Sequence, residues 1–183
     1  MNIFDRLIYF DKVVGEIIVS SRTSHADSFY YKITWLGEWQ VIFFFFLITG
    51  ALFMLYSQRK FIWPFLVAII GTGVMTVLIK YLVGRARPGV GIALYVEKLP
   101  SFPSAHASLS FAFYGFLVYC LWKSHFRLIF KIVLSIFLFL IIYFVGYSRI
   151  YLGVHFLSDV IAGYLVGLLW VLIAMYCSHR RVC

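Results

Sequence analysis

The feature that most limits what this chain can fold into is a series of five long apolar runs. They cover residues 39–56, 61–83, 105–122, 126–147 and 156–177. Each is close to the ~20 residues that a helix needs to cross the hydrocarbon core of a bilayer. Lipid offers no partner to free backbone polar groups, so such runs are expected to be helical. The pattern predicts an all-α, polytopic membrane helical bundle with about five transmembrane helices.

The composition points to the same class. The chain has 183 residues, of which 63% are hydrophobic and 13% charged, with a mean hydropathy of +0.96. Soluble domains are about 45–50% apolar and about 25% charged, so a soluble protein is excluded. The formal charge of +9 suits anionic lipid surfaces or anionic substrates. Basic residues of membrane proteins usually lie in cytoplasmic loops, so no nucleic-acid partner is expected.

An amphipathic helix is predicted before the first run. Residues 3–18 carry apolar side chains at helical spacing, whereas Asp5, Lys12 and Glu16 collect on the opposite face. This segment is too charged to span comfortably, so we expect it to lie in the plane of the membrane interface.

A polar connection is expected over residues 20–38. We therefore predict a single membrane domain over 1–183, with 1–38 as an interfacial segment and 39–177 as the transmembrane core.

The basic residues suggest an orientation. Alternation of five spans puts the breaks 57–60 and 123–125 and the tail 178–183 on one side. The basic residues in or next to these segments are Arg59, Lys60, Lys123, Arg127, Lys131, Arg180 and Arg181. By the positive-inside rule this side is cytoplasmic. The breaks 84–104 and 148–155 then lie on the other side.

Three polar stretches interrupt the apolar sequence on that other side. They are residues 80–88, 101–106 and 148–159. Ionisable groups at the ends of spans are costly and indicate function by default. The basic residues among them also run against the charge bias, which suggests that they are kept for chemistry. We predict that the three stretches meet and form a phosphate-cleaving site.

The third stretch holds a candidate nucleophile. His155 and Asp159 are four residues apart and would share one face of a helix. An Asp that accepts from one imidazole nitrogen fixes the tautomer and leaves the other nitrogen free to attack. Arg149 lies six residues earlier, and Gly153 allows a tight reversal between them.

The other two stretches supply groups that suit a phosphate. Ser104 is a good N-cap, the amides beyond it form an anion site, and His106 in the same turn could protonate a leaving oxygen. Lys80 and Arg87 are natural holders of phosphate oxygens. For Arg85 we favour a role as a snorkelling interfacial anchor.

Together the stretches resemble the type 2 phosphatidic acid phosphatase (PAP2) superfamily, which includes vanadium haloperoxidases. The family pattern is K-x6-RP, then PSGH, then SR-x5-H-x3-D. This chain reads Lys80-x6-Arg87-Pro88, Pro103-Ser104-Ala105-His106 and Ser148-Arg149-x5-His155-x3-Asp159. All spacings fit, in order. The one departure is Ala105 where the family has Gly, and many members have six spans.

The resemblance implies a mechanism without a metal or cofactor. His155 would form a phosphohistidine, Asp159 would orient it, and His106 would protonate the leaving oxygen. The phosphate would be held by Lys80, Arg87, Ser104, the Ala105 amide and Arg149.

The expected activity is that of a metal-independent phosphatase acting on a membrane lipid, at the extracytoplasmic face of a bacterial inner membrane. Candidate substrates are an isoprenyl diphosphate, the 1-phosphate of lipid A, phosphatidylglycerophosphate or phosphatidate. Two alternatives are kept: a vanadium-dependent haloperoxidase on the same residues, and a small transporter or channel without enzymatic activity. The oligomeric state is left open.

Overall fold

A computed structural model describes residues 3–89, 93–95 and 97–180, and this part of the chain is helical without any strand. Its elements are α1 (Ile3–Ser20), α2 (Ser24–Thr34), η1 (Trp35–Gly37), α3 (Trp39–Leu55), η2 (Arg59–Phe61), α4 (Ile62–Val83), α5 (Ala105–Trp122), α6 (Leu128–Tyr151) and α7 (Leu157–Arg180). The five predicted apolar runs correspond to α3 through α7. The all-α prediction is confirmed.

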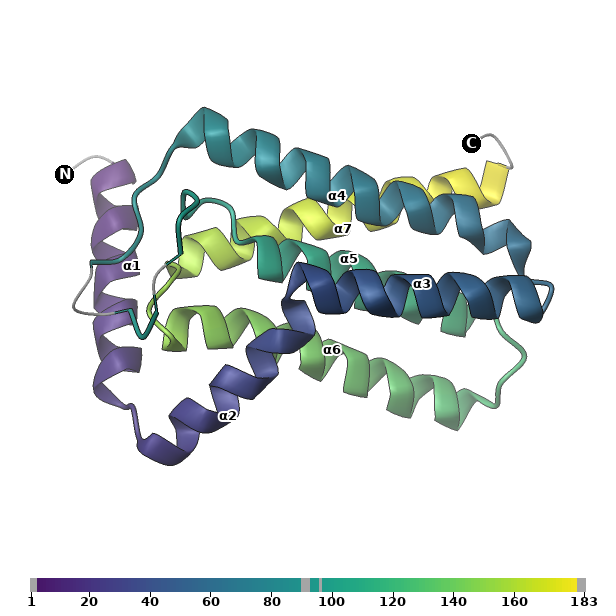
Figure 1. The fold of residues 1–183 in the computed structure, drawn as a ribbon, viewed down its shortest axis with the longest axis horizontal. Helices are drawn as coiled ribbons and strands as arrows, with labels where there is room; N and C mark the ends of the chain where they lie inside the picture. Colours follow the sequence, from purple (N-terminus) through teal and green to yellow (C-terminus); the bar gives the residue numbers. More distant parts are fainter. Residues whose placement is uncertain (1–2, 90–92, 96, 181–183) are drawn as a thin grey trace.

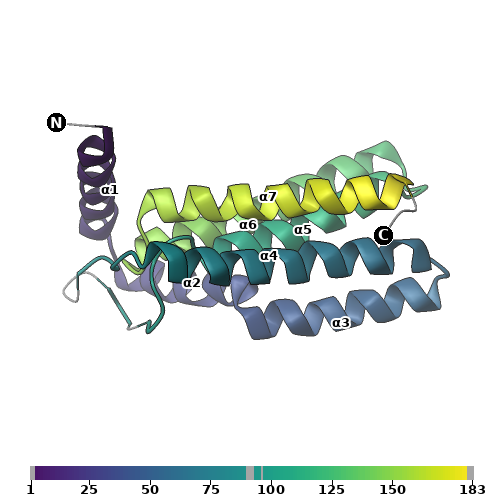
Figure 2. The ribbon, with the colours of Figure 1, turned by 90° about the horizontal axis from the view of Figure 1, so that it is seen from above.

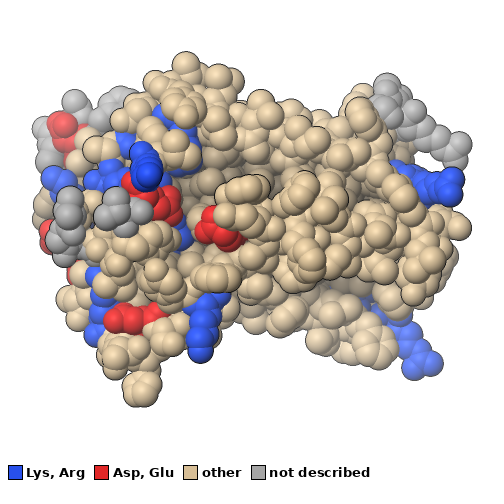
Figure 3. Space-filling view, viewed as in Figure 1, with Lys and Arg blue, Asp and Glu red and all other residues tan. Residues whose placement is uncertain are grey.

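Helices α3 to α7 run side by side in alternating directions, and α5 contacts all four of the others (Figure 1). Helix α1 lies across one end of this bundle, where it contacts α6 and α7 (Figure 2). On the face shown in Figure 3, acidic and basic side chains gather together toward the α1 end, whereas the far end shows basic ones without acidic ones. The polar stretches of the sequence therefore have a definite place, at the end that α1 covers.

Within the part of the chain that the structure describes, four helical segments are long and apolar enough to cross a membrane. They are Arg59–Val83, Ala105–Trp122, Leu128–Tyr151 and Leu157–His179. Helix α3 is short by itself, and together with Ser24–Gly37 it forms a pair bent by 50° that would be a fifth span. The predicted number of about five spans agrees with four or five candidates.

The expected polar connection over 20–38 is wrong, because most of it is helical. Thr23 caps α2 by accepting a hydrogen bond from the Ala26 amide. Tyr30 packs its ring against Tyr151 of α6, with 4.2 Å between ring centroids. Tertiary packing of aromatic side chains therefore stabilises a helix in a segment whose overall polarity suggested a loop.

The break predicted over residues 148–155 begins one helical turn too early, because α6 extends through its first four residues. Ser148 and Arg149 belong to α6, which continues to Tyr151. The Ser148 hydroxyl donates to the Val145 carbonyl within the helix. A charged residue does not end a helix when its head group finds a partner, and Arg149 has such partners at the site described below.

Close packing of α5 on α7 joins two parts of that site. Gly163 and Gly167 of α7 face α5 so closely that a Cβ on Gly167 would lie 2.5 Å from the Ser108 carbonyl oxygen. Small residues four apart allow helix backbones in membranes to approach in this way. The α5–α7 contact lies directly beneath the residues that begin both helices.

We expect Gly167→Ala to destabilise the protein by about 1–3 kcal/mol, because the added methyl group overpacks a backbone contact. For a chain of this size the melting temperature should fall by about 2–4 °C per kcal/mol, measured by thermal unfolding in detergent. The matched control is Gly73→Ala in α4, where nothing lies within 4 Å of the new methyl group. Equal melting temperatures for the two variants would contradict the packing described here.

Candidate active site

The three polar stretches converge on one cavity at the α1 end of the bundle. The cavity has a volume of about 380 Å³, and its wall includes Lys80, Arg87, Ala105, His106 and His155. The other predicted site residues, Ser104, Arg149 and Asp159, are fully buried. The structure thus brings all three stretches together around one space.

His155 lies in the short connection between α6 and α7. Gly153 makes the reversal possible by adopting a φ of 73°, as expected from the sequence. His155 Nε2 lies 3.2 Å from Nη1 of Arg87. An arginine nitrogen can only donate, so Nε2 accepts, and a neutral imidazole then carries its proton on Nδ1. The lone pair of Nε2 is therefore directed toward the cavity wall that Arg87 forms.

The surroundings of His155 favour the neutral form. The side chain is almost completely buried, with 2% of its surface exposed. Burial, followed by the positive charges of Arg149 and Arg87, holds the pKa of His155 well below the usual 6.5. A neutral imidazole keeps a lone pair on one nitrogen and is the form that can act as a nucleophile.

Asp159 faces the opposite edge of the same imidazole. Its Oδ2 lies 3.4 Å from His155 Nδ1 and accepts a hydrogen bond from the Phe156 amide at 2.9 Å. Its Oδ1 pairs with Arg85 Nη1 at 2.6 Å. The prediction that Arg85 is a snorkelling anchor is wrong. Gly84 ends α4 in a left-handed conformation and turns the chain so that the guanidinium group reaches Asp159 instead.

Arg87 is held by backbone carbonyl groups. Its Nε donates to the Leu99 carbonyl at 2.8 Å, and its Nη1 donates to the Val154 carbonyl at 2.7 Å. Its Nη2 forms an ion pair with Glu97 at 2.6 Å. These contacts fix the guanidinium plane beside His155.

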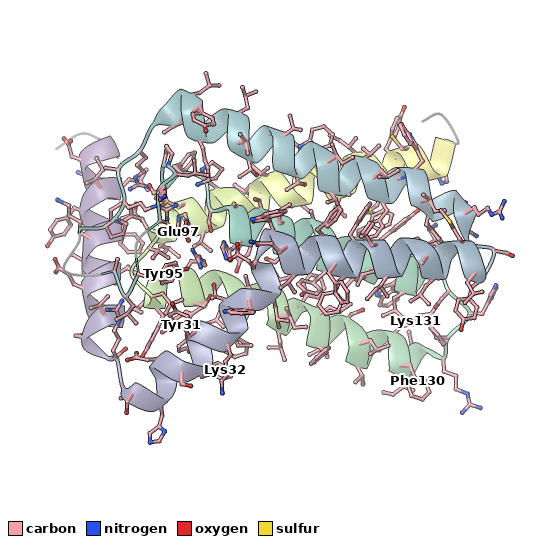
Figure 4. The ribbon with its side chains drawn as sticks, in the orientation of Figure 1. Tyr31, Lys32, Tyr95, Glu97, Phe130 and Lys131 are labelled. Atoms are coloured by element: carbon pink, nitrogen blue, oxygen red, sulfur yellow. The ribbon has the colours of Figure 1, made fainter. Side chains whose placement is uncertain are left out.

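Arg149 approaches the same carboxylate from α6. It donates to Oε1 of Glu97 and to the Tyr95 hydroxyl, and its Nη1 donates to Thr34 Oγ1 at 2.7 Å. Figure 4 labels Tyr95 and Glu97 near α1, in the connection between α4 and α5. One carboxylate therefore joins two arginines from distant parts of the chain.

Glu97 is ionised in this position. Burial alone would raise its pKa, but the charges of Arg149 and Arg87 outweigh burial and lower the pKa to about 2. Burial raises the pKa of Tyr95 to about 12, so its hydroxyl keeps its proton. Glu97 is thus an anion bound between the two arginines and next to the neutral His155.

Lys80 and Ser104 stabilise the backbone around the cavity. Lys80 is buried in the last turn of α4, and its ammonium group donates to the carbonyls of Pro100 and Ser101. Ser104 is the N-cap of α5, as predicted, and its own amide donates to the Asp159 carbonyl at 3.0 Å. The starts of α5 and α7 are joined by that bond.

His106, in contrast to His155, has a carboxylate as the partner of its Nε2. Its Nε2 lies 2.8 Å from Oε2 of Glu38, at the start of α3, and both side chains line the cavity. A carboxylate oxygen can only accept, so Nε2 of His106 carries a proton and donates it to this hydrogen bond. The two histidines of the site therefore differ in the hydrogen bond that Nε2 makes: it accepts from Arg87 in His155 and donates to Glu38 in His106.

Sequence reasoning assigned no role in the site to several residues, namely Asp11, Thr34, Glu38, Arg85, Tyr95 and Glu97. Only 7 of the 183 residues are acidic, so each acid in so apolar a chain was informative. An acid near a predicted span should be matched with a predicted cation. That rule would have marked Glu38 and Glu97 as candidates.

Comparison with known proteins identifies the family. The family model for the PAP2 superfamily matches residues 61–183. Phosphatidylglycerophosphatase B of Bacillus subtilis is 30% identical over 164 residues, which cover 87% of this chain and 78% of that protein. Lipid A 4'-phosphatase of Bacteroides thetaiotaomicron is 33% identical over 99 residues, which cover 49% of this chain and 40% of that protein.

Solved structures show the same fold. The PAP2-type phosphatidylglycerolphosphate phosphatase of B. subtilis superposes with a TM-score of 0.87 at 27% identity, covering 96% of this chain and 87% of that one. LpxE of Aquifex aeolicus superposes with a TM-score of 0.71 at 25% identity, covering 88% and 92% respectively. The chain therefore belongs to the PAP2 superfamily and is a membrane phosphatase of that family, a phosphoric ester hydrolase.

Proposed function

We propose that this protein removes the phosphate or diphosphate head group of a membrane lipid through a phosphohistidine on His155. The observation that carries the proposal is the position of the Glu97 carboxylate. It lies on both Arg87 and Arg149, and Arg87 also contacts Nε2 of His155. This arrangement supports an anion site next to a neutral imidazole.

The first step uses the two histidines in different ways. The lipid phosphate displaces Glu97 and binds to Arg87 and Arg149, with Lys80 on the cavity wall. Nε2 of His155 attacks phosphorus while the bond from phosphorus to the lipid oxygen breaks. The proton shared by His106 and Glu38 passes to that leaving oxygen. Charge that builds on the phosphoryl oxygens is stabilised by the cations.

The second step releases phosphate. Water attacks the phosphohistidine and gives its proton to His106, and the bond between phosphorus and Nε2 breaks. His155 returns to its neutral form, and His106 again shares its proton with Glu38. Ser104 and the Ala105 amide at the start of α5 are proposed to contact the phosphoryl oxygens during both steps, the latter despite its extra methyl group.

We propose that the reaction requires no metal ion. The acidic side chains beside His155 are already committed to cations, Asp159 to Arg85 and Glu97 to Arg87 and Arg149. The arginines supply the positive charge that a metal would otherwise place on the phosphoryl group.

The head group is a phosphate, but its carrier is one of several lipids. One relative is named for phosphatidylglycerophosphate and another for lipid A. For this chain we propose the candidates that the sequence analysis named: phosphatidylglycerophosphate or phosphatidate, the 1-phosphate of lipid A, or an isoprenyl diphosphate. We also propose residues 1–38 as an interfacial segment and 39–177 as the membrane core of a single domain. The site would face the extracytoplasmic side of a bacterial inner membrane.

Phosphate release in detergent, with the candidate lipids supplied as a panel and with excess chelator, tests the reaction. Release should persist in chelator, and His155→Ala should lower it roughly a thousand-fold or more and abolish any acid-labile phosphoenzyme. The control is His125→Ala, in the α5–α6 connection at the far end. Loss of activity in chelator with rescue by magnesium would refute metal independence.

The pH dependence follows from the lowered pKa of His155. Protonation removes the attacking lone pair, and a depressed pKa moves that protonation to a lower pH. His155 should therefore remain neutral at pH 6.5, the usual pKa of a histidine. Nuclear magnetic resonance of protein labelled with [15N]histidine measures this directly, with His155→Asn used to assign the signal. A side chain half protonated at pH 6.5 or above would contradict the description of the site.

Glu97→Gln tests whether the carboxylate occupies the phosphate position. Gln has nearly the same shape but no charge, so an incoming anion no longer competes with a carboxylate for Arg87 and Arg149. Inhibition by vanadate should become tighter by about tenfold, the equivalent of one charge-assisted hydrogen bond. Asp5→Asn, an exposed change on α1, controls for the general loss of a negative charge. Weaker inhibition in Glu97→Gln would mean that Glu97 helps to bind the anion.

A further inference from the structure

A second chain of charges extends from the candidate nucleophile to the N-terminal helix. Arg85 Nη1 lies 2.6 Å from Asp159 Oδ1, and Arg85 Nη2 lies 2.7 Å from Asp11 Oδ2. Asp159 in turn faces His155 Nδ1 with its other oxygen. Four side chains from α1, the α4–α5 connection, the α6–α7 connection and α7 therefore form one continuous series.

A helix on the surface of a protein normally buries apolar side chains and exposes charged ones. Helix α1 buries the charged side chain of Asp11 instead. Asp11 is 2% exposed, whereas the apolar side chains of Leu7, Phe10 and Ile17 on the same helix are 48%, 54% and 63% exposed. Aspartate is almost never fully buried unless it is paired. Helix α1 is therefore oriented so that one carboxylate points into the protein, and that orientation requires a reason.

Asp11 also binds the first turn of α7. Its Oδ1 accepts from the Ser158 amide at 3.0 Å, and its Oδ2 accepts from the Ser158 hydroxyl. The amides of a first helical turn have no partner within their own helix, and here a side chain from another helix caps one of them. Asp11 thus fixes the turn that carries Asp159 as well as the guanidinium group that binds it.

The two terminal nitrogens of the Arg85 guanidinium group pair with different carboxylates, Nη1 with Asp159 and Nη2 with Asp11. The guanidinium group also lies over the Phe156 ring, 4.3 Å from its centroid, while 22% of the side chain remains exposed. Without Asp11, Nη2 would lose its charged partner and the fork could turn toward water. Asp159 would then lose the contact that fixes Oδ1, and only the Phe156 amide would still hold its Oδ2 near His155.

We propose that Asp11 is a positioning residue for the phosphatase reaction. Through Arg85 it orients Asp159, so that Oδ2 accepts a hydrogen bond from Nδ1–H of His155 and the lone pair stays on Nε2, the nitrogen that attacks. The distance of 3.4 Å between Nδ1 and Oδ2 would shorten when a phosphate binds, as catalytic hydrogen bonds commonly do. This proposal rests on the proposed role of His155, and it makes α1 part of the active site although Asp11 touches no substrate.

The kinetic test compares Asp11→Asn with Asp5→Asn, an equal loss of charge at an exposed position of the same helix. Residues that orient a histidine through a second group typically contribute about 10–100-fold, so kcat should fall about tenfold. The KM should stay within about twofold, because Asp11 does not line the 380 Å³ cavity proposed for the phosphate. Asp5→Asn should behave as wild type. An unchanged kcat in Asp11→Asn, or a rise in KM alone, would overturn the proposal.

A spectroscopic test separates positioning from simple stabilisation. In [15N]histidine-labelled wild type, His155 should carry its proton on Nδ1, and in Asp11→Asn the signal should show a mixture of both tautomers. A kcat loss with the wild-type tautomer and a lowered melting temperature would assign Asp11 a structural role only and refute the proposal. Should Asp11→Asn fail to fold, Arg85→Lys replaces it. Lysine keeps the positive charge but cannot bind two carboxylates with two separate nitrogens, so the same mixture of His155 tautomers is expected. A wild-type tautomer in Arg85→Lys would contradict the proposal.

The outcomes for the two proposals are distinguishable. If the wild type releases no phosphate from any candidate lipid, the proposed function fails, and the tautomer measurement still reports whether Asp11 orients His155. If His155→Ala abolishes release while Asp11→Asn changes neither kcat nor tautomer, the proposed function stands and the role of Asp11 is refuted.

Discussion

Two guanidinium groups, the partly buried one of Arg87 and the fully buried one of Arg149, share the single carboxylate of Glu97. The rest of the site depends on how that charge is balanced. Arg149 has no exposed surface, so an unpaired charge there would cost several kcal/mol. One carboxylate carries one negative charge against two positive ones. A phosphate with close to two negative charges near neutral pH balances the pair better. The arrangement is therefore stable without substrate and is better satisfied with one.

The same excess of positive charge acts on one of the two histidines. Burial, together with the cations around His155, lowers its pKa and keeps it neutral. His106 has the Glu38 carboxylate as its hydrogen-bond partner. In the proposed mechanism the two histidines therefore take different roles, a pattern that marks acid and nucleophile in many active sites. The closely packed α5 and α7 hold the two sides of the cavity at a fixed separation.

The sequence was sufficient for the spans and for the neighbourhood of the site. Apolar runs of the right length cross a membrane only as helices. The polar residues at the ends of these helices must come together or face water, so the convergence of 80–88, 101–106 and 148–159 was predictable. The roles of Asp11, Glu38 and Glu97 were not. Their partners are 74, 68 and up to 52 residues away, and no local pattern encodes pairings over such distances. Helix α2 was missed for the same reason, since aromatic packing on α6 outweighs its polar composition.

The structure of the protein with bound vanadate would test the central claim most directly. Vanadate resembles the phosphoryl group during transfer and can form a bond with an imidazole. We predict vanadium within bonding distance of Nε2 of His155, with its oxygens contacting Arg87 and Arg149 and the Glu97 carboxylate displaced from both. Vanadate bound elsewhere in the cavity, with Glu97 still paired to the two arginines and Nε2 of His155 uncoordinated, would contradict the account.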